Sequence, residues 1–136
     1  MIAVENSIGF LAYLEKKRAA QVSWNNVEIL YASDSDPELE PNSIDLVFMC
    51  DVYHHLEKPV IFFKPLKQTL NKDARIVVID FYRDPNKVTS RPPEWVLQHV
   101  RADQATFRRE IESSGFAHVR DLEAPGLSEN YIMLFQ

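Results

Sequence analysis

Two continuous apolar runs constrain the fold of this chain most strongly. The first lies within residues 44 to 49 (IDLVFM) and the second lies within residues 75 to 81 (RIVVIDF). Uninterrupted apolar runs are typical of strands in a parallel sheet that is covered on both faces. Between them, residues 58 to 71 place apolar side chains at helical spacing. The sequence therefore predicts a strand–helix–strand unit in which the two strands lie side by side.

The rest of the chain continues this alternation of strands and helices. Further strands are expected at residues 2–4, 27–32, 116–123 and 130–135, and further helices at residues 7–20, 92–100 and 103–114. The predicted order is β-α-β-β-α-β-α-α-β-β. This order indicates an open α/β sheet, mainly parallel, with an antiparallel hairpin at its C-terminal end.

Two of the predicted helices carry more specific expectations. In the helix at 7–20, Ile8 and Leu11 lie on the face that we expect to be buried. In the helix at 58–71, Pro65 is expected to kink or split the helix, because it cannot donate a backbone hydrogen bond. The long polar segment at 82–93 has a length typical of loops that cover a site.

Composition limits the class of protein. A chain of 136 residues predicts a single domain over residues 1–136. Its net charge of −5 argues against a nucleic-acid or anionic-membrane partner. The one cysteine, Cys50, permits no intrachain disulfide, which favours a cytoplasmic location. The apolar runs are too short to span a membrane, and the first residues do not resemble a signal peptide.

Polar residues directly follow the apolar run at 44–49, and they raise the question of a site. Asp51 comes first, and the pair His54 and His55 follows. One histidine could act as an acid or base. Alternatively, one ring packs at the junction of strand and helix while the other faces water.

A metal site is the third interpretation of the histidine pair. Further ligands would have to come from Cys50, Asp51, His99 and His118, whose spacing matches no metal motif. Adjacent histidines on a helix are expected to point in different directions. We therefore expect no metal site, and we expect Cys50 to be a small buried apolar residue rather than a nucleophile.

Four segments together resemble a known family. They are NSIDLVFMCDVYHHLEKP, LKQTLNKDARIVVIDF, SSGFAHVRDLE and the NYIMLF ending. Their order and spacing are similar to class I S-adenosylmethionine-dependent methyltransferases, nearest to the small-molecule branch of ubiquinone and menaquinone biosynthesis. The resemblance implies S-adenosyl-L-methionine as cofactor and methyl transfer to a small-molecule substrate. It also implies the sheet order 3-2-1-4-5-7-6 with the last strand antiparallel.

The resemblance further implies which residues line the cofactor site. Glu5, at the end of family strand 2, would accept hydrogen bonds from the ribose hydroxyls. Ser33 or Asp34 would border the adenine. Cys50 and Asp51, at the exit of family strand 4, would lie near the methionyl end. Asp51 and His54 are the candidates for a catalytic role.

The chain departs from the family in its glycines. It has three, Gly9, Gly115 and Gly126, and none lies in the glycine-rich turn that follows family strand 1. The match begins at family strand 2, so we expect a truncated domain that binds S-adenosylmethionine weakly by itself. The alternative is a non-catalytic methyltransferase-like subunit or interaction domain. A flavodoxin-like or receiver-like domain would fit the strand pattern but not the terminal hairpin.

The missing strand would lie in the middle of the sheet, between the strands at residues 2–4 and 44–49. Their unpaired backbone groups would be costly if they were buried. The two strands could pair with each other, accept a strand from another chain, or dimerise through their edges. We expect a homodimer or a complex with a complementary chain.

Overall fold

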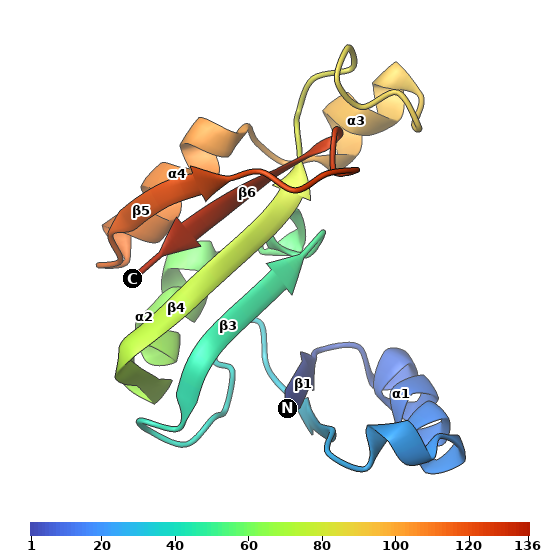
Figure 1. Cartoon of the computed structure of the whole chain (residues 1–136), viewed down its shortest axis with the longest axis vertical. Coiled ribbons are helices and arrows are strands. Elements are labelled where there is room, and N and C mark those ends of the chain that lie inside the picture. The colour runs from blue at the N-terminus through green and yellow to red at the C-terminus, as the bar shows by residue number, and fades with distance from the viewer.

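The computed structural model describes residues 1–136 and shows strands alternating with helices along the chain (Figure 1). The strands are β1 (Ile2–Glu5), β2 (Glu28–Tyr31), β3 (Ile44–Cys50), β4 (Leu70–Phe81), β5 (His118–Leu122) and β6 (Asn130–Phe135). The α-helices are α1 (Ile8–Ala20), α2 (Pro59–Thr69), α3 (Pro93–His99) and α4 (Gln104–Ser113), and the 3₁₀ turns are η1 (Val22–Trp24) and η2 (Tyr53–His55). The predicted order of strands and α-helices is confirmed.

Four strands form the main sheet in the order β3-β4-β6-β5. β3 pairs with β4 in parallel, and α2 connects the two strands. β6 lies antiparallel to both β4 and β5. The predicted strand–helix–strand unit and the antiparallel C-terminal hairpin are therefore confirmed.

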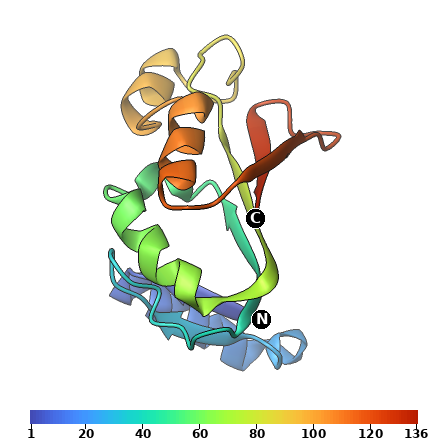
Figure 2. The same cartoon turned by 90° about the vertical axis from the view of Figure 1, so that its left-hand side faces the viewer.

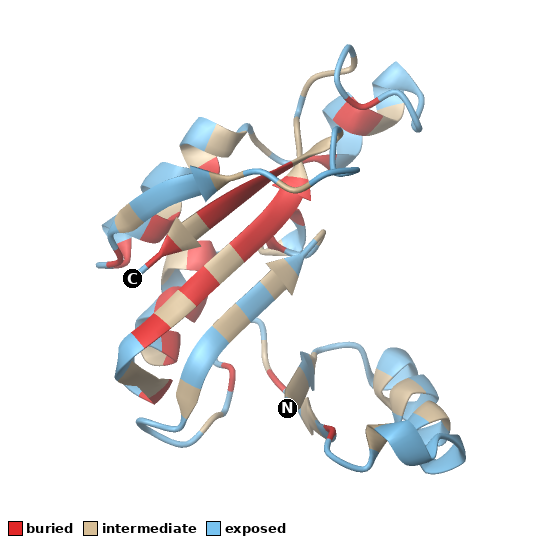
Figure 3. Cartoon of the chain, in the orientation of Figure 1, coloured by how far each residue is buried: buried red, intermediate tan, exposed pale blue.

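The core lies between this sheet and two helices. Figure 2 shows α2 and α4 on the same face of the sheet, and Figure 3 shows buried residues concentrated along β4 and β6. Ile76 and Val78 of β4 lie opposite Phe135 and Met133 of β6, and all four side chains are buried. The helices contribute Phe63, Leu66, Phe107 and Ile111 to the same cluster. Alternate strand residues thus meet the helices, as the period of a pleated strand requires.

The predicted single sheet is divided in two. β1 and β2 form a separate parallel pair, and no strand lies between β1 and β3. Figure 1 shows this pair and α1 set apart from the main sheet. No hydrogen bond joins residues 1–38 to residues 44–136. β1 and β3 therefore do not close the gap by pairing with each other.

The predicted buried face of α1 is wrong. No residue of α1 is buried, and Ile8 is 78% exposed. The reason is that α1 packs mainly on the small β1–β2 sheet and the turn η1, which offer too little apolar surface to cover a helix face. The open face of the main sheet also lacks apolar cover, because Leu46 and Phe48 of β3 are 56% and 61% exposed.

Two local predictions about α2 and β4 also need correction. Pro65 does not split α2, which continues as one helix from Pro59 to Thr69. Proline removes only one backbone donor, and the buried Phe63 and Leu66 hold the helix on the core on either side of it. β4 starts at Leu70, directly after α2, and not at residue 75. None of the helices is both long and apolar enough to cross a lipid bilayer.

Candidate functional site

A cavity of about 540 Å³ lies at the carboxyl ends of β1 and β2. This volume falls within the range of small-molecule and cofactor sites. It is lined by Val4, Glu5, Asn6, Ala32, Ser33, Asp34, Val52, His55, Leu56, Glu57, Lys58 and Phe62. The structure thus brings Glu5, Ser33 and Asp34, three of the residues selected from the sequence, into one cavity.

The polar wall of the cavity follows from the pairing of β1 with β2. The parallel register places Glu5 opposite Tyr31, so the residues after both strands emerge together. There the Asn6 amide donates a hydrogen bond to Asp34 Oδ1 at 2.7 Å. Glu5 Oε1 accepts from the backbone N–H of Ser7 at 2.7 Å. These bonds fix the two carboxylates and leave further acceptor positions on both of them.

Ser33 stabilises the turn beside this wall. Its hydroxyl accepts a hydrogen bond from the backbone N–H of Asp36 at 3.1 Å. Its backbone N–H donates to the carbonyl of Asp36 at 3.1 Å. Ser33 therefore shapes the cavity rim through the turn that it closes.

The opposite wall comes from the segment that follows β3. η2 supplies His55 to the cavity, its flanking residues supply Val52 and Leu56, and the first turn of α2 supplies Phe62. Asp51 adopts the left-handed conformation, with φ at 53°, so the chain turns sharply where the strand ends. The wall at η2 and α2 thus combines apolar side chains with polar or charged ones, namely Val52, Leu56 and Phe62 with His55, Glu57 and Lys58.

Asp51 lies outside this cavity. Its Oδ1 accepts a hydrogen bond at 2.7 Å from the Asn130 amide, at the start of β6. Partial burial and the Asp80 carboxylate raise the pKa of Asp51 above its usual range. A raised pKa moves a carboxyl group toward the range that suits general acid–base chemistry.

Cys50 also lies outside the cavity, and the prediction that it is buried is wrong. Its side chain is exposed, because no strand or helix covers β3 on the side of the gap. Partial burial, followed by the Asp51 and Asp80 carboxylates, raises the pKa of the thiol. A protonated thiol is a poor nucleophile, so the prediction that Cys50 is not a nucleophile remains in place.

His54 is buried at the junction of β3 and η2. Its backbone N–H donates to Asp80 Oδ2 at 2.9 Å, and its Nδ1 lies 2.6 Å from Asp80 Oδ1. The Asp80 side chain is fully buried at the end of β4. His54 therefore ties the segment after β3 to the neighbouring strand, whereas His55 is exposed and borders the cavity.

The expectation that the two adjacent histidines point in different directions is wrong. The centroids of the His54 and His55 rings are 4.1 Å apart. The cause is that both residues lie in a tight 3₁₀ turn rather than in an α-helix. His99, at the end of α3, joins them with its ring centroid 4.9 Å and 5.0 Å from theirs.

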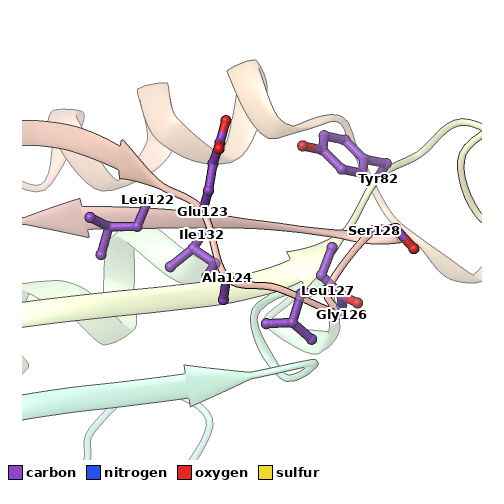
Figure 4. Close-up of a pocket in the computed structure, with 9 residues that line it drawn as sticks. Tyr82, Leu122, Glu123, Ala124, Gly126, Leu127, Ser128 and Ile132 are labelled. Atoms are coloured by element: carbon purple, nitrogen blue, oxygen red, sulfur yellow. The ribbon is translucent and has the colours of Figure 1, made fainter.

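A second cavity of about 280 Å³ lies beside the hairpin of β5 and β6. Figure 4 shows that Leu122, Leu127 and Ile132 contribute to its lining and that the Glu123 carboxylate is directed away from Leu127. It is smaller than the usual range for ligand sites. It contains none of the residues selected from the sequence, so we do not assign it a cofactor.

Sequence reasoning missed several residues of the main cavity. Asn6 was missed although it directly follows Glu5, and its position one residue past a strand end was the available signal. Lys58 and Phe62 were predicted only as part of the helix at 58–71, and Leu56 and Glu57 were given no role. Their place in the cavity depends on the distance across the gap, which no sequence pattern reports.

One comparison with known proteins identifies a family. Residues 1–78 match a family model described as a methyltransferase domain. No curated protein matches the chain in sequence.

Solved structures share the fold at low sequence identity. A SAM dependent methyltransferase from Aquifex aeolicus has a TM-score of 0.83 and 22% identity, over 98% of this chain and 66% of that one. An S-adenosylmethionine dependent methyltransferase from Mesorhizobium loti has a TM-score of 0.71 and 17% identity, over 98% of this chain and 78% of that one. Mitomycin 7-O-methyltransferase has a TM-score of 0.75 and 18% identity, over 99% of this chain and 41% of that one. The chain therefore spans less than two thirds of the first and third of these structures.

Proposed function

This chain belongs to the methyltransferase domain family, and on that basis we propose that its 540 Å³ cavity is part of an S-adenosylmethionine site. We propose methyl transfer to a small-molecule substrate as the reaction that this site serves. One observation carries the proposal. Glu5 and Asp34, from the ends of two adjacent parallel strands, face one cavity of suitable size. Ligands of open α/β sheets bind at this edge.

The polar wall offers the acceptors that the nucleoside part of the cofactor requires. Glu5 Oε1 already accepts from Ser7, which leaves Oε2 for the vicinal hydroxyls of a ribose. Asp34 keeps one carboxylate oxygen beyond the bond from Asn6, and it can accept from an exocyclic amino group. The apolar side chains of Val52 and Leu56 offer surface for a base. When bound, the cofactor supplies an electrophilic methyl group.

Proton transfer, where the substrate needs it, is proposed for the end of β3. Asp51 is half-buried there, and its pKa is raised by burial and by Asp80. His54, the other candidate from the sequence, has one ring nitrogen engaged by Asp80 and its side chain enclosed. We therefore assign His54 a positioning role and retain Asp51 as the candidate acid or base.

The site is incomplete between β1 and β3. No strand occupies that place in the sheet, and no glycine lines the cavity to let backbone approach the methionyl group closely. Loss of several hydrogen bonds of about 1 kcal/mol each weakens binding by orders of magnitude. We propose that residues 1–136 alone bind the cofactor weakly. The same gap favours a second candidate function, a methyltransferase-like subunit without catalysis of its own.

A β-strand from outside residues 1–136 would complete the sheet. We propose that it inserts between β1 and β3, from a second polypeptide or from another part of the same protein. β3 presents an unpaired edge there, with Leu46 and Phe48 exposed beside it. Free edges that carry apolar residues are templates for further pairing.

Titration calorimetry with S-adenosylmethionine tests the cofactor assignment. We expect residues 1–136 to bind S-adenosylmethionine weakly, with a dissociation constant above about 100 μM. Glu5→Ala should weaken binding about tenfold or more, because hydrogen bonds to charged groups contribute about 1.5–3 kcal/mol. Glu28→Ala is the matched control, since Glu28 is exposed and starts β2 at the other end of the same sheet.

Two results would count against this proposal. Low-micromolar binding by the isolated monomer would show that the site is already complete. Equal affinity of the wild type and Glu5→Ala would show that the β1–β2 wall does not hold the ribose.

A further inference from the structure

Three of the four histidines of this chain gather at one place. His54 and His55 lie in η2, and His99 ends α3. One ring nitrogen from each lies within 4.8 Å of the others. His54 is buried, and His55 and His99 are exposed. The cluster therefore has one buried member and two members that solvent can reach.

The buried member has an unsatisfied ring nitrogen. His54 Nδ1 is engaged by Asp80 Oδ1 at 2.6 Å. His54 Nε2 is buried and has no hydrogen-bond partner. With Nδ1–H donating to the carboxylate, neutral His54 carries a lone pair on Nε2. Native proteins rarely leave such an atom without a partner, so this nitrogen points to a missing ligand.

Ring packing explains part of the arrangement but leaves Nε2 unsatisfied. His99 stacks on Trp95 with centroids 4.3 Å apart, and it meets both other histidines edge to face. Aromatic stacking accounts for the position of His99. It supplies no donor or cation to His54 Nε2.

We propose that His54, His55 and His99 bind one divalent transition-metal ion, with Zn²⁺ as the best match. Three imidazoles are a common ligand set for zinc and leave a fourth position open. The bond between His54 and Asp80 is the arrangement that orients a metal-binding histidine and increases its basicity.

The geometry requires only small movements. Zinc–nitrogen distances of about 2.0–2.1 Å place tetrahedral ligand atoms about 3.3 Å apart. The ring nitrogens here lie within 4.8 Å, and rotation of the exposed His55 and His99 side chains can close the difference. The ion would join α3 to η2.

The site also borders the main cavity, because His55 lines it. The open coordination position could hold water or an oxygen atom of a ligand. This proposal does not depend on cofactor binding in the cavity, since none of its evidence uses Glu5 or Asp34.

Calorimetric titration of the metal-free chain with Zn²⁺ tests the proposal, and Co²⁺ provides a visible absorption signature of the ligand set. We expect one ion per chain with a dissociation constant of about 1 μM or lower. His55→Gln and His99→Gln should each weaken Zn²⁺ binding at least about tenfold. Replacing a residue that only hydrogen-bonds a metal ligand already lowers metal affinity by about this factor. Both positions are exposed, so circular dichroism should show intact folds.

His118→Gln is the matched control. It removes the one histidine outside the cluster, which contacts Asp121 at 2.8 Å, and it should bind Zn²⁺ like the wild type. The proposal is overturned if saturable binding is absent below about 1 mM. It is also overturned if both cluster variants bind as tightly as the His118→Gln control.

Discussion

Replacing Asp80 with alanine should cost the domain a large part of its stability. Asp80 is fully buried and accepts from the backbone N–H of His54 at 2.9 Å and from His54 Nδ1 at 2.6 Å. Asp80→Ala leaves both of these His54 donors unsatisfied in the interior. Each unsatisfied buried donor costs about 1–3 kcal/mol, and breaking a buried pair from one side costs about 3–5 kcal/mol. We therefore expect a loss of about 3–5 kcal/mol in the free energy of unfolding.

Urea unfolding followed by circular dichroism measures this loss. With an m-value of about 2 kcal/mol/M, a loss of about 4 kcal/mol lowers the midpoint by about 2 M urea. Asp80→Asn keeps one acceptor oxygen, so we expect about half the effect, roughly 2 kcal/mol. Asp45→Ala is the control, because Asp45 lies on β3 with an exposed side chain that accepts from Asn71. It should change stability by less than about 0.5 kcal/mol.

The reasoning is refuted if Asp80→Ala unfolds at the same urea concentration as Asp45→Ala. That result would mean that water or a rearranged side chain satisfies His54 at no cost. The packing of the segment after β3 against β4 would then not depend on the His54–Asp80 pair.

Three further predictions concern a loop, a helix and assembly. Glu129 accepts hydrogen bonds from Thr89 and Ser90, and Ser90 is the main cause that lowers its pKa to about 2. Because the folded pKa is depressed, the anchoring is complete above about pH 4.5 and is lost as the pH falls towards 2. Glu129→Gln should speed hydrogen exchange of the Thr89 and Ser90 backbone amides at neutral pH. Unchanged exchange would mean that the Glu129 carboxylate does not hold this loop. Asp103 caps α4 through the backbone N–H of Thr106 at 2.8 Å, so Asp103→Ala should lower stability by about 0.5–2 kcal/mol in thermal unfolding. Light scattering after size exclusion should show a dimer or a co-purifying chain at the free edges of β1 and β3, and a stable monomer without one would reject this assembly.

The order of elements could be predicted because it depends on local patterns. The runs at 44–49 and 75–81 are long and apolar, and the pairing of β3 with β4 follows from the helix between them. Placement of Glu5 and Asp34 in one cavity follows from the same logic, since adjacent parallel strands end at one edge.

Burial next to the gap could not be predicted in this way. The expected burial of Ile8 and Cys50 assumed a continuous sheet with a helix on each face, whereas β1 and β3 do not pair. Burial is a property of neighbours, and no strand occupies the place between β1 and β3.

The histidine cluster escaped sequence reasoning for a different reason. His99 belongs to another helix, and its approach to His54 depends on the path of the chain between β4 and α3. The direction of the His55 ring depends on a 3₁₀ turn, which has a different residue period from the expected α-helix.

Nuclear magnetic resonance titration of the isotope-labelled chain with S-adenosylmethionine tests the central claim most directly, because it locates even weak binding. The account predicts saturable shifts at the amides of Glu5, Asn6, Ser33 and Asp34, where β1 and β2 end at the 540 Å³ cavity. Shifts confined to the hairpin cavity near Tyr82 and Leu127 would contradict it. The absence of shifts up to about 5 mM cofactor would also contradict it, because this concentration detects even millimolar affinity.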